Sequence, residues 1–397
     1  MIEIQIVLLV IGIVLLLGVL LSKLSSYIGI PTLIVFLLIG LFFNANQYFH
    51  LSADFYRIIQ DISIFALIII IFSGGLDTNT GKIKPIIKKG IILSTIGTFI
   101  TAIVSGLLIH YILRFDLILS FLIGSIISST DAAAIFSIFK SDKMKLKSNL
   151  PETLEVESAS NDAMAYILMI SFLQMIITPE TSIMGIFIVF AKSLIIGGVF
   201  GYIFGKLSAK LIESIDLNIN GLYPVLLLSL AILSFTFSEI LTGNGFLAVY
   251  ISGLLIGNAK LPYKTNEVTF FDGLAWVMQI IMFLLLGLFT FPKQLISNTH
   301  DSLIISIILL LIARPLSVFI SMIPFKTPIN EKIFLSWTGI KGAVPIVFAT
   351  YPLVMGIPNA EMIFNIVFFV TIISVILQGG TVKYLAKKLN LININIK

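Results

Sequence analysis

Ionisable side chains within four of the apolar stretches of the sequence are the residues that could do chemistry. A Glu-Ser-Ala-Ser-Asn-Asp run occupies positions 157–162 near the start of one stretch. Asp131, Arg314 and Lys341 lie inside three others. An ionised group at the centre of a bilayer costs roughly 2.5–3.5 kcal/mol on insertion scales. We therefore expect these groups to compensate one another or to line a water-filled cavity.

The 157–162 run has the composition of a cation site. On a helix, Glu157 lies one turn before Asn161, and both share one face. Ser158 lies one turn before Asp162 on the adjacent face. Carboxylate, hydroxyl and amide oxygens suit hard cations. The sequence has no cysteine and its three histidines are far apart, so we expect no transition-metal or haem site and no cofactor.

Asp131 and Lys341 lie in sequence contexts that break helices. Asp131 ends a Ser-Ser-Thr-Asp run, and Lys341 lies in a Gly-Ile-Lys-Gly run with Pro345 shortly after it. Such runs interrupt a helix and satisfy the backbone groups that the break sets free. Because half-helix ends carry partial charges, Asp131 suits a helix N-terminus and Lys341 a C-terminus. Compensation of these ends and direct ligation of an ion, to which Thr130 can also offer oxygen, are both open.

The composition describes the protein that must position these residues. Of the 397 residues, 58% are hydrophobic and only 11% are charged, with a mean hydropathy of +1.10. A soluble domain carries roughly 25% charged residues, so the lipid bilayer is the expected solvent here. The net charge of +5 comes from lysines in the loops between apolar stretches. That pattern indicates membrane topology and no nucleic-acid partner.

The apolar stretches predict an all-α polytopic membrane protein with 13 transmembrane helices. Helices satisfy their own backbone hydrogen bonds in lipid, and strand-like alternation is absent from the sequence. We interpret the first stretch as a retained span, not a signal peptide, and we expect no soluble regulatory domain after the last. The predicted spans are 4–22, 29–43, 58–74, 86–113, 117–139, 153–177, 182–205, 221–241, 244–258, 270–291, 302–324, 331–352 and 362–382.

The basic residues orient these spans. Nineteen of the 25 lysines and arginines fall in the loops on one side, three fall in the loops on the other side, and three lie within spans. By the positive-inside rule, the N-terminus lies outside the cell membrane and the C-terminus is cytoplasmic.

Thirteen spans divide into six, one and six. We predict a single transmembrane domain over 1–397, with repeat 1 at about 4–177, a linking helix at about 182–205 and repeat 2 at about 221–382. A single intervening helix inverts the second repeat relative to the first, as in many transporters. The fifth and twelfth spans then correspond, and we expect them to be broken helices that cross near the midplane.

At these residues the sequence resembles the monovalent cation:proton antiporter-1 family, which includes sodium/proton exchangers and bacterial potassium/proton antiporters. The likeness runs along essentially the whole chain. The segment from Gly342 to Pro352, with Asn359 beyond it, is most similar to the potassium/proton branch. The matching segments are Thr130–Phe136, Glu157–Asp162, Ala313–Leu316 and Gly339–Ile346.

The resemblance implies a sodium/proton antiporter fold, with a mobile ion-binding core and a scaffold that forms a homodimer. It implies that Asp162 binds the cation or the proton, and that Glu157 pairs with Arg314 as a structural ion pair. In carrying Asn-Asp instead of Asp-Asp at this place, the chain resembles electroneutral exchangers. The residues that the resemblance implies around Asp162 are Asn161, Ser158, Thr130 and Asp131.

The predicted function is exchange of a monovalent cation (K⁺ or Na⁺) for H⁺ by competition at Asp162. Burial disfavours the charged carboxylate and a bound cation favours it, so the cation and the proton exclude each other. The core then moves only when the site is neutralised, which gives alternating access. Selectivity among sodium, potassium and lithium depends on the size of the cavity.

Two departures from the family and two alternative functions accompany this prediction. Relatives often place an acid where this chain has Ser73. Lys341 replaces a more usual arginine, which keeps the charge but loses the bidentate fork.

A cation channel is one alternative, although no selectivity loop is evident. An intramembrane aspartyl protease using Asp131 and Asp162 is the other, although its Gly-x-Gly-Asp signature is missing.

Overall fold

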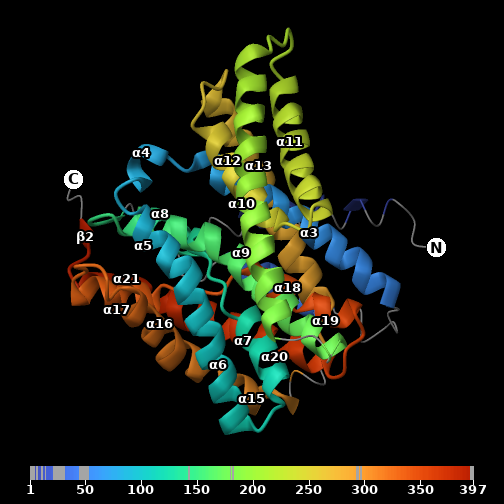
Figure 1. Cartoon of the computed structure of the whole chain (residues 1–397), viewed down its shortest axis with the longest axis vertical. Coiled ribbons are helices and arrows are strands. Elements are labelled where there is room, and N and C mark those ends of the chain that lie inside the picture. The colour runs from blue at the N-terminus through green and yellow to red at the C-terminus, as the bar shows by residue number, and fades with distance from the viewer. Residues whose placement is uncertain are drawn as a thin grey trace.

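The structure is a computed structural model, and it is a bundle of helices that cross one another at several angles (Figure 1). It describes residues 5, 8–9, 12–13, 15–20, 32–43, 53–141, 144–178, 180, 183–291, 295 and 297–393. Among these residues, eight helices are long and apolar enough to cross a membrane, and three further apolar helices are shorter.

The helices follow the predicted apolar stretches closely. In chain order they are α2 (Thr32–Phe42), α3 (Ala53–Asp77), α4 (Thr80–Ile83), α5 (Ile87–Ile92), α6 (Thr98–Leu113), α7 (Leu117–Ile126), α8 (Ala132–Ser141), α9 (Leu150–Ile177), α10 (Ile183–Ser214), α11 (Leu222–Ile240), α12 (Gly245–Gly257), α13 (Lys264–Leu288), α15 (Thr299–Ile307), α16 (Arg314–Ser321), α17 (Ile329–Trp337), α18 (Ala343–Phe348), α19 (Thr350–Val354), α20 (Ala360–Ser374) and α21 (Gly380–Lys388).

The predicted all-α membrane fold is therefore confirmed, whereas the number of thirteen spans stays a prediction. Of the predicted span at 4–22, the structure describes residues 5, 8–9, 12–13 and 15–20, and the others lie outside the described residues. The helices at 117–126, 245–257 and 343–354 are each shorter than a full bilayer crossing. The division into repeats around a linking helix also stays a prediction.

Within the described residues, three of the spans pass through a π-helical turn, which the sequence did not predict. These turns are η2 (Leu93–Gly97), η3 (Ile308–Ala313) and η4 (Val375–Gly379). Such turns are frequent at functional sites because they rotate the side chains that follow them. Here η3 ends immediately before Arg314, and η4 contains Gln378.

Two spans are broken where the sequence predicts breaks. Residues 127–131 separate α7 from α8, and residues 338–342 separate α17 from α18. The two non-helical segments lie in contact, and the backbone N–H of Asp131 donates to the carbonyl of Ile340 at 2.8 Å. The predicted crossing of the two broken helices is thereby confirmed.

A second region, which we call the scaffold, consists of α2, α3, α10, α11, α12 and α13. Figure 1 shows α10 to α13 extending together beyond the rest of the bundle. Gly201 and Gly205 of α10 lie directly against the backbone of α12, and Gly197 lies against that of Asn244 just before it. A Cβ on Gly201 would lie 2.7 Å from Ala248 Cα. Small residues at this four-residue spacing let membrane helices approach closely. Van der Waals contact between backbones therefore holds this pair together.

A short antiparallel pair of strands joins the loop before α9 to the end of the described chain. Strand β1 (Lys145–Leu146) pairs with β2 (Ile392–Asn393). The N–H of Lys147 also donates to the carbonyl of Leu391 at 2.8 Å. The loop between α8 and α9 is thus tied to the segment that follows α21.

Candidate cation site

Asp162 lies on α9 at the helix crossing, and only 8% of its surface is exposed. One carboxylate oxygen accepts a hydrogen bond of 2.5 Å from the hydroxyl of Ser129. Ser129 belongs to the non-helical segment between α7 and α8. The carboxylate therefore points into the bundle, towards the break in the first broken helix, and not towards lipid.

Asn161 and Ser158 hold that break in place from the same helix. The side-chain amide of Asn161 donates to Thr130 Oγ1 at 2.5 Å, and its oxygen accepts from the N–H of Thr130 at 3.4 Å. The hydroxyl of Ser158 donates to the carbonyl of Thr130 at 3.0 Å and accepts from the N–H of Ala132 at 3.0 Å. These bonds satisfy polar groups that the helix break would otherwise leave unpaired in an apolar interior.

Asp131 lies at the N-terminus of α8. Its carboxylate accepts a hydrogen bond of 3.3 Å from the N–H of Ala134. Its other oxygen lies so close to Gly342 that a Cβ there would be 2.4 Å away. Gly342 therefore allows the second broken helix to approach this carboxylate. A negative charge at this position is favourable because helix N-termini carry a partial positive charge.

Lys341 lies in the second break, and its side chain reaches the α7 end of the first break. Its ammonium group donates to the carbonyls of Ser129 at 2.8 Å and Ser128 at 3.3 Å, at the C-terminal end of α7. The side chain is 1% exposed. Its backbone N–H donates to Ser374, whose hydroxyl contacts Gln378 in η4. One positive charge thus compensates carbonyls that have no partner within their own helix.

Glu157 and Arg314 form a buried ion pair with an N–O distance of 2.5 Å. Their side chains are 1% and 2% exposed. The guanidinium also donates to the carbonyl of Leu335 in α17 at 3.3 Å. A Cβ on Gly339 would lie 2.7 Å from Arg314 Nε, so the second break packs directly on this group. The pair joins α9 to α16 and to the second broken helix.

The structure brings together all eight residues singled out in the sequence. Ser129 joins them as a further site residue, and sequence reasoning did not single it out. Helical spacing predicts which side chains share a face, but Ser129 lies in a non-helical segment to which that spacing does not apply. Its place in the Ser-Ser-Thr-Asp run, beside Thr130, was the only signal available.

The cluster has one negative charge in excess when its groups have their ordinary charges. Asp131, Glu157 and Asp162 supply three negative charges, and Arg314 and Lys341 supply two positive ones. Among the described residues, no group of three His, Cys, Asp or Glu side chains is arranged to hold a metal ion. The excess of one negative charge is the amount that a single monovalent cation or a single proton balances.

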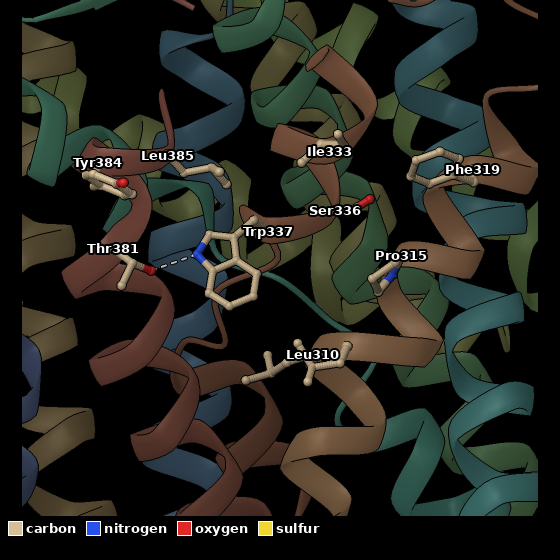
Figure 2. Close-up of a pocket in the computed structure, with 10 residues that line it drawn as sticks. Leu310, Pro315, Phe319, Ile333, Ser336, Trp337, Thr381, Tyr384 and Leu385 are labelled. Atoms are coloured by element: carbon tan, nitrogen blue, oxygen red, sulfur yellow. Dashed lines mark hydrogen bonds between the residues drawn. The ribbon is translucent and has the colours of Figure 1, made fainter. Parts of the chain in front are cut away.

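An apolar groove with a volume of about 330 Å³ lies beside the second broken helix (Figure 2). Asp162 is not among the residues that line it. Trp337 lies in this groove and donates its indole N–H to Thr381 at 2.8 Å. Leu310 and Phe319 line its other side. The lining has hydroxyls but no carboxylate, so the groove is separate from the cation site.

Two crossed, broken helices beside a buried carboxylate are typical of membrane transporters built from inverted repeats. The chain belongs to the sodium/hydrogen exchanger family, whose transmembrane region matches residues 11–388. This result confirms the resemblance that the sequence motifs indicate.

Relatives and solved structures agree with this assignment. The K(+)/H(+) antiporter NhaP of Alkalimonas amylolytica is 37% identical over 388 residues, covering 98% of this chain and 67% of the relative. The K(+)/H(+) antiporter NhaP2 of Shewanella oneidensis is 35% identical over 373 residues, covering 93% and 64%. The chain thus spans about two thirds of the length of these relatives.

A solved structure shows the same fold. The sodium proton antiporter MjNhaP1 from Methanocaldococcus jannaschii superposes with a TM-score of 0.82 over 95% of this chain and 99% of that chain, at 24% sequence identity. The predicted sodium/proton antiporter fold is therefore confirmed.

Proposed function

We propose that this protein is a secondary antiporter that exchanges a monovalent cation for a proton, and that both compete for Asp162. The observation that carries the proposal is the single excess negative charge in the buried cluster. Either one proton or one monovalent cation neutralises it, and a buried unpaired charge is costly enough that one of them is needed. The two ions then exclude each other at one carboxylate.

The same charge balance supports electroneutral exchange. A bound monovalent cation and a bound proton each bring the net charge of the cluster to zero. One cation is therefore exchanged for one proton, and no net charge crosses the membrane. The surrounding oxygens come from Ser129, Thr130 and Asn161, which are neutral ligands suited to an alkali cation. The names of the K(+)/H(+) antiporter relatives favour potassium as the first cation to test.

Placement in the cell membrane as a homodimer is part of the proposal. The excess of lysines in alternate loops supports an external N-terminus and a cytoplasmic C-terminus. With this orientation, the N-terminal end of α9 faces the cytoplasm.

A channel or an aspartyl protease fits the site less well. A channel needs a continuous path, whereas Asp162 is almost fully buried. A protease needs two carboxylates that share a water, whereas Asp131 is engaged with the N-terminus of α8 and Asp162 with Ser129.

Exchange in proteoliposomes that contain a pH-sensitive dye tests the proposal. Addition of K⁺, Na⁺ or Li⁺ in turn should collapse a preformed pH gradient with the wild-type protein and not with Asp162→Asn. Asp216→Asn, at an exposed loop position, is the matched control and should exchange normally. Cation-dependent proton flux through Asp162→Asn at the wild-type rate would refute competition at Asp162.

A further inference from the structure

Glu155 lies on the same face of α9 as Asp162, seven residues nearer the N-terminal end of the helix. Seven residues are almost two full turns, and they correspond to a rise of about 10 Å along the axis. Glu155 is only partly buried. It therefore lies between Asp162 and the end of α9 that is predicted to face the cytoplasm.

Thr78, which follows the last turn of α3, is in contact with this carboxylate. Thr78 Oγ1 lies 2.5 Å from a carboxylate oxygen of Glu155 and 2.7 Å from the carbonyl of Gly74. A hydroxyl has one hydrogen and cannot donate to both oxygens at once. If the hydroxyl donates to Gly74, its contact with Glu155 needs either a proton on Glu155, which then donates to Thr78 Oγ1, or a cation that both oxygens coordinate.

Tyr250 on α12 presents a third oxygen to the same place. Its side chain is 4% exposed, and its hydroxyl is close enough to interact with Thr78 and with the charge on Glu155. In the described part of the chain this hydroxyl makes no hydrogen bond of regular geometry. A buried hydroxyl without a regular partner is costly, and a cation beside Glu155 would give it one.

Two of these three groups are held rigidly. A Cβ on Gly75 of α3 would lie 2.7 Å from the carbonyl of Tyr250, so the two scaffold helices touch at this point. The carbonyl of Thr78 also accepts from the side chain of Asn258 at 2.8 Å. Glu155, in contrast, is on α9, which carries Asp162. The contact therefore joins the scaffold to the helix that carries the cation site.

We propose that Glu155, Thr78 and Tyr250 form a second, transient binding site for a monovalent cation or a proton on the cytoplasmic path to Asp162. The inference rests on the proposed antiport function and extends it. A carboxylate, two hydroxyls and the carbonyl of Gly74 provide the oxygen ligands that alkali cations take. Neighbouring Asp77 and Glu152 add negative charge, and Lys82 adds positive charge.

The absence of cysteine from the chain makes a charge-rescue experiment possible. Glu155→Cys, reconstituted as the full chain, should raise the half-saturating concentration of cytoplasmic K⁺ about tenfold, the effect of losing one charged ligand. Modification with a sulfonatoethyl methanethiosulfonate restores a negative charge and should return the value towards wild type. Modification with the trimethylammonium-ethyl methanethiosulfonate, which adds a positive charge, should not return the value towards wild type. Neither reagent should affect the wild-type protein.

Controls separate this inference from the proposed function. Glu331→Gln removes one acidic charge at the N-terminal end of α17 and should leave the half-saturating concentration unchanged. If Glu155→Cys cannot be purified, Tyr250→Phe takes its place. This substitution removes the hydroxyl alone and should raise the half-saturating concentration of cytoplasmic K⁺ about two- to fivefold. An unchanged half-saturating concentration of K⁺ in Glu155→Cys would overturn the second site while leaving antiport intact. The same result in Tyr250→Phe would do so where only that variant can be purified. Absence of exchange in the wild-type protein would overturn antiport itself.

Discussion

The scaffold and the helix crossing are held together by different forces. Where α10 meets α12, glycine and small residues let two backbones touch, and the contact is apolar. At the crossing, five charged side chains and the hydrogen bonds of Thr130 join segments that are not helical. Close packing has one good arrangement, whereas a charge cluster can exchange one positive ion for another. The comparison suggests a rigid frame beside a site that can change its occupant.

Removal of one partner of the buried ion pair should have the largest effect. Arg314→Ala leaves the carboxylate of Glu157 buried without a counter-charge, which destabilises a protein by about 3–5 kcal/mol. We expect a large fall in the thermal unfolding temperature of the purified protein in detergent. Glu157→Gln with Arg314→Met removes both charges and should recover most of the loss. Equal unfolding temperatures for wild type and Arg314→Ala would contradict a structural role for the pair.

A larger side chain in the scaffold should have the next largest effect. Gly201→Val places atoms where the Cβ alone would lie 2.7 Å from Ala248 Cα, and overpacking of this kind costs about 1–3 kcal/mol. The thermal unfolding temperature should fall, while the apparent cation affinity of the folded fraction should stay at the wild-type value. Gly198→Val is the matched control, because a Cβ at Gly198 meets only one side-chain atom, at 4.0 Å. A change in cation affinity with Gly201→Val would show that the two regions are not separable.

Removal of the Ser129 hydroxyl should have the smallest effect. Ser129→Ala deletes one hydrogen bond to Asp162, which corresponds to about 1 kcal/mol or roughly a fivefold change in apparent cation affinity. The unfolding temperature should change little, because the hydroxyl is not needed to compensate α7. Dye-based exchange over a series of cation concentrations measures the change. An unchanged affinity would mean that Ser129 does not contribute to the site.

Much of this architecture could be predicted from the sequence because its signals are local. The spacing of Glu157, Ser158, Asn161 and Asp162 along one helix is sufficient to predict their shared faces. Breaks at Asp131 and Lys341 follow from residues that interrupt helices. In both cases, residues within one or two turns determine the outcome.

Other features depend on parts of the chain that are distant in sequence. Thr78 contacts Glu155 across 77 positions, and no periodic pattern connects them. The π-helical turn before Arg314 lies in a uniformly apolar run, Ile308–Ala313, in which no residue type marks the change of helix. The direction of the Ser129 side chain depends on a backbone segment that is neither helix nor strand, so no regular spacing predicts it.

Proton release on cation binding tests the central claim most directly. Purified wild-type protein in a weakly buffered solution with a pH-sensitive dye should release a proton when K⁺ or Na⁺ binds, up to one per chain, because both ions occupy Asp162 in turn. Asp162→Asn should release none, whereas Asp216→Asn should match the wild type. Cation binding to the wild-type protein without any proton release over the whole pH range of activity would contradict competition at this carboxylate.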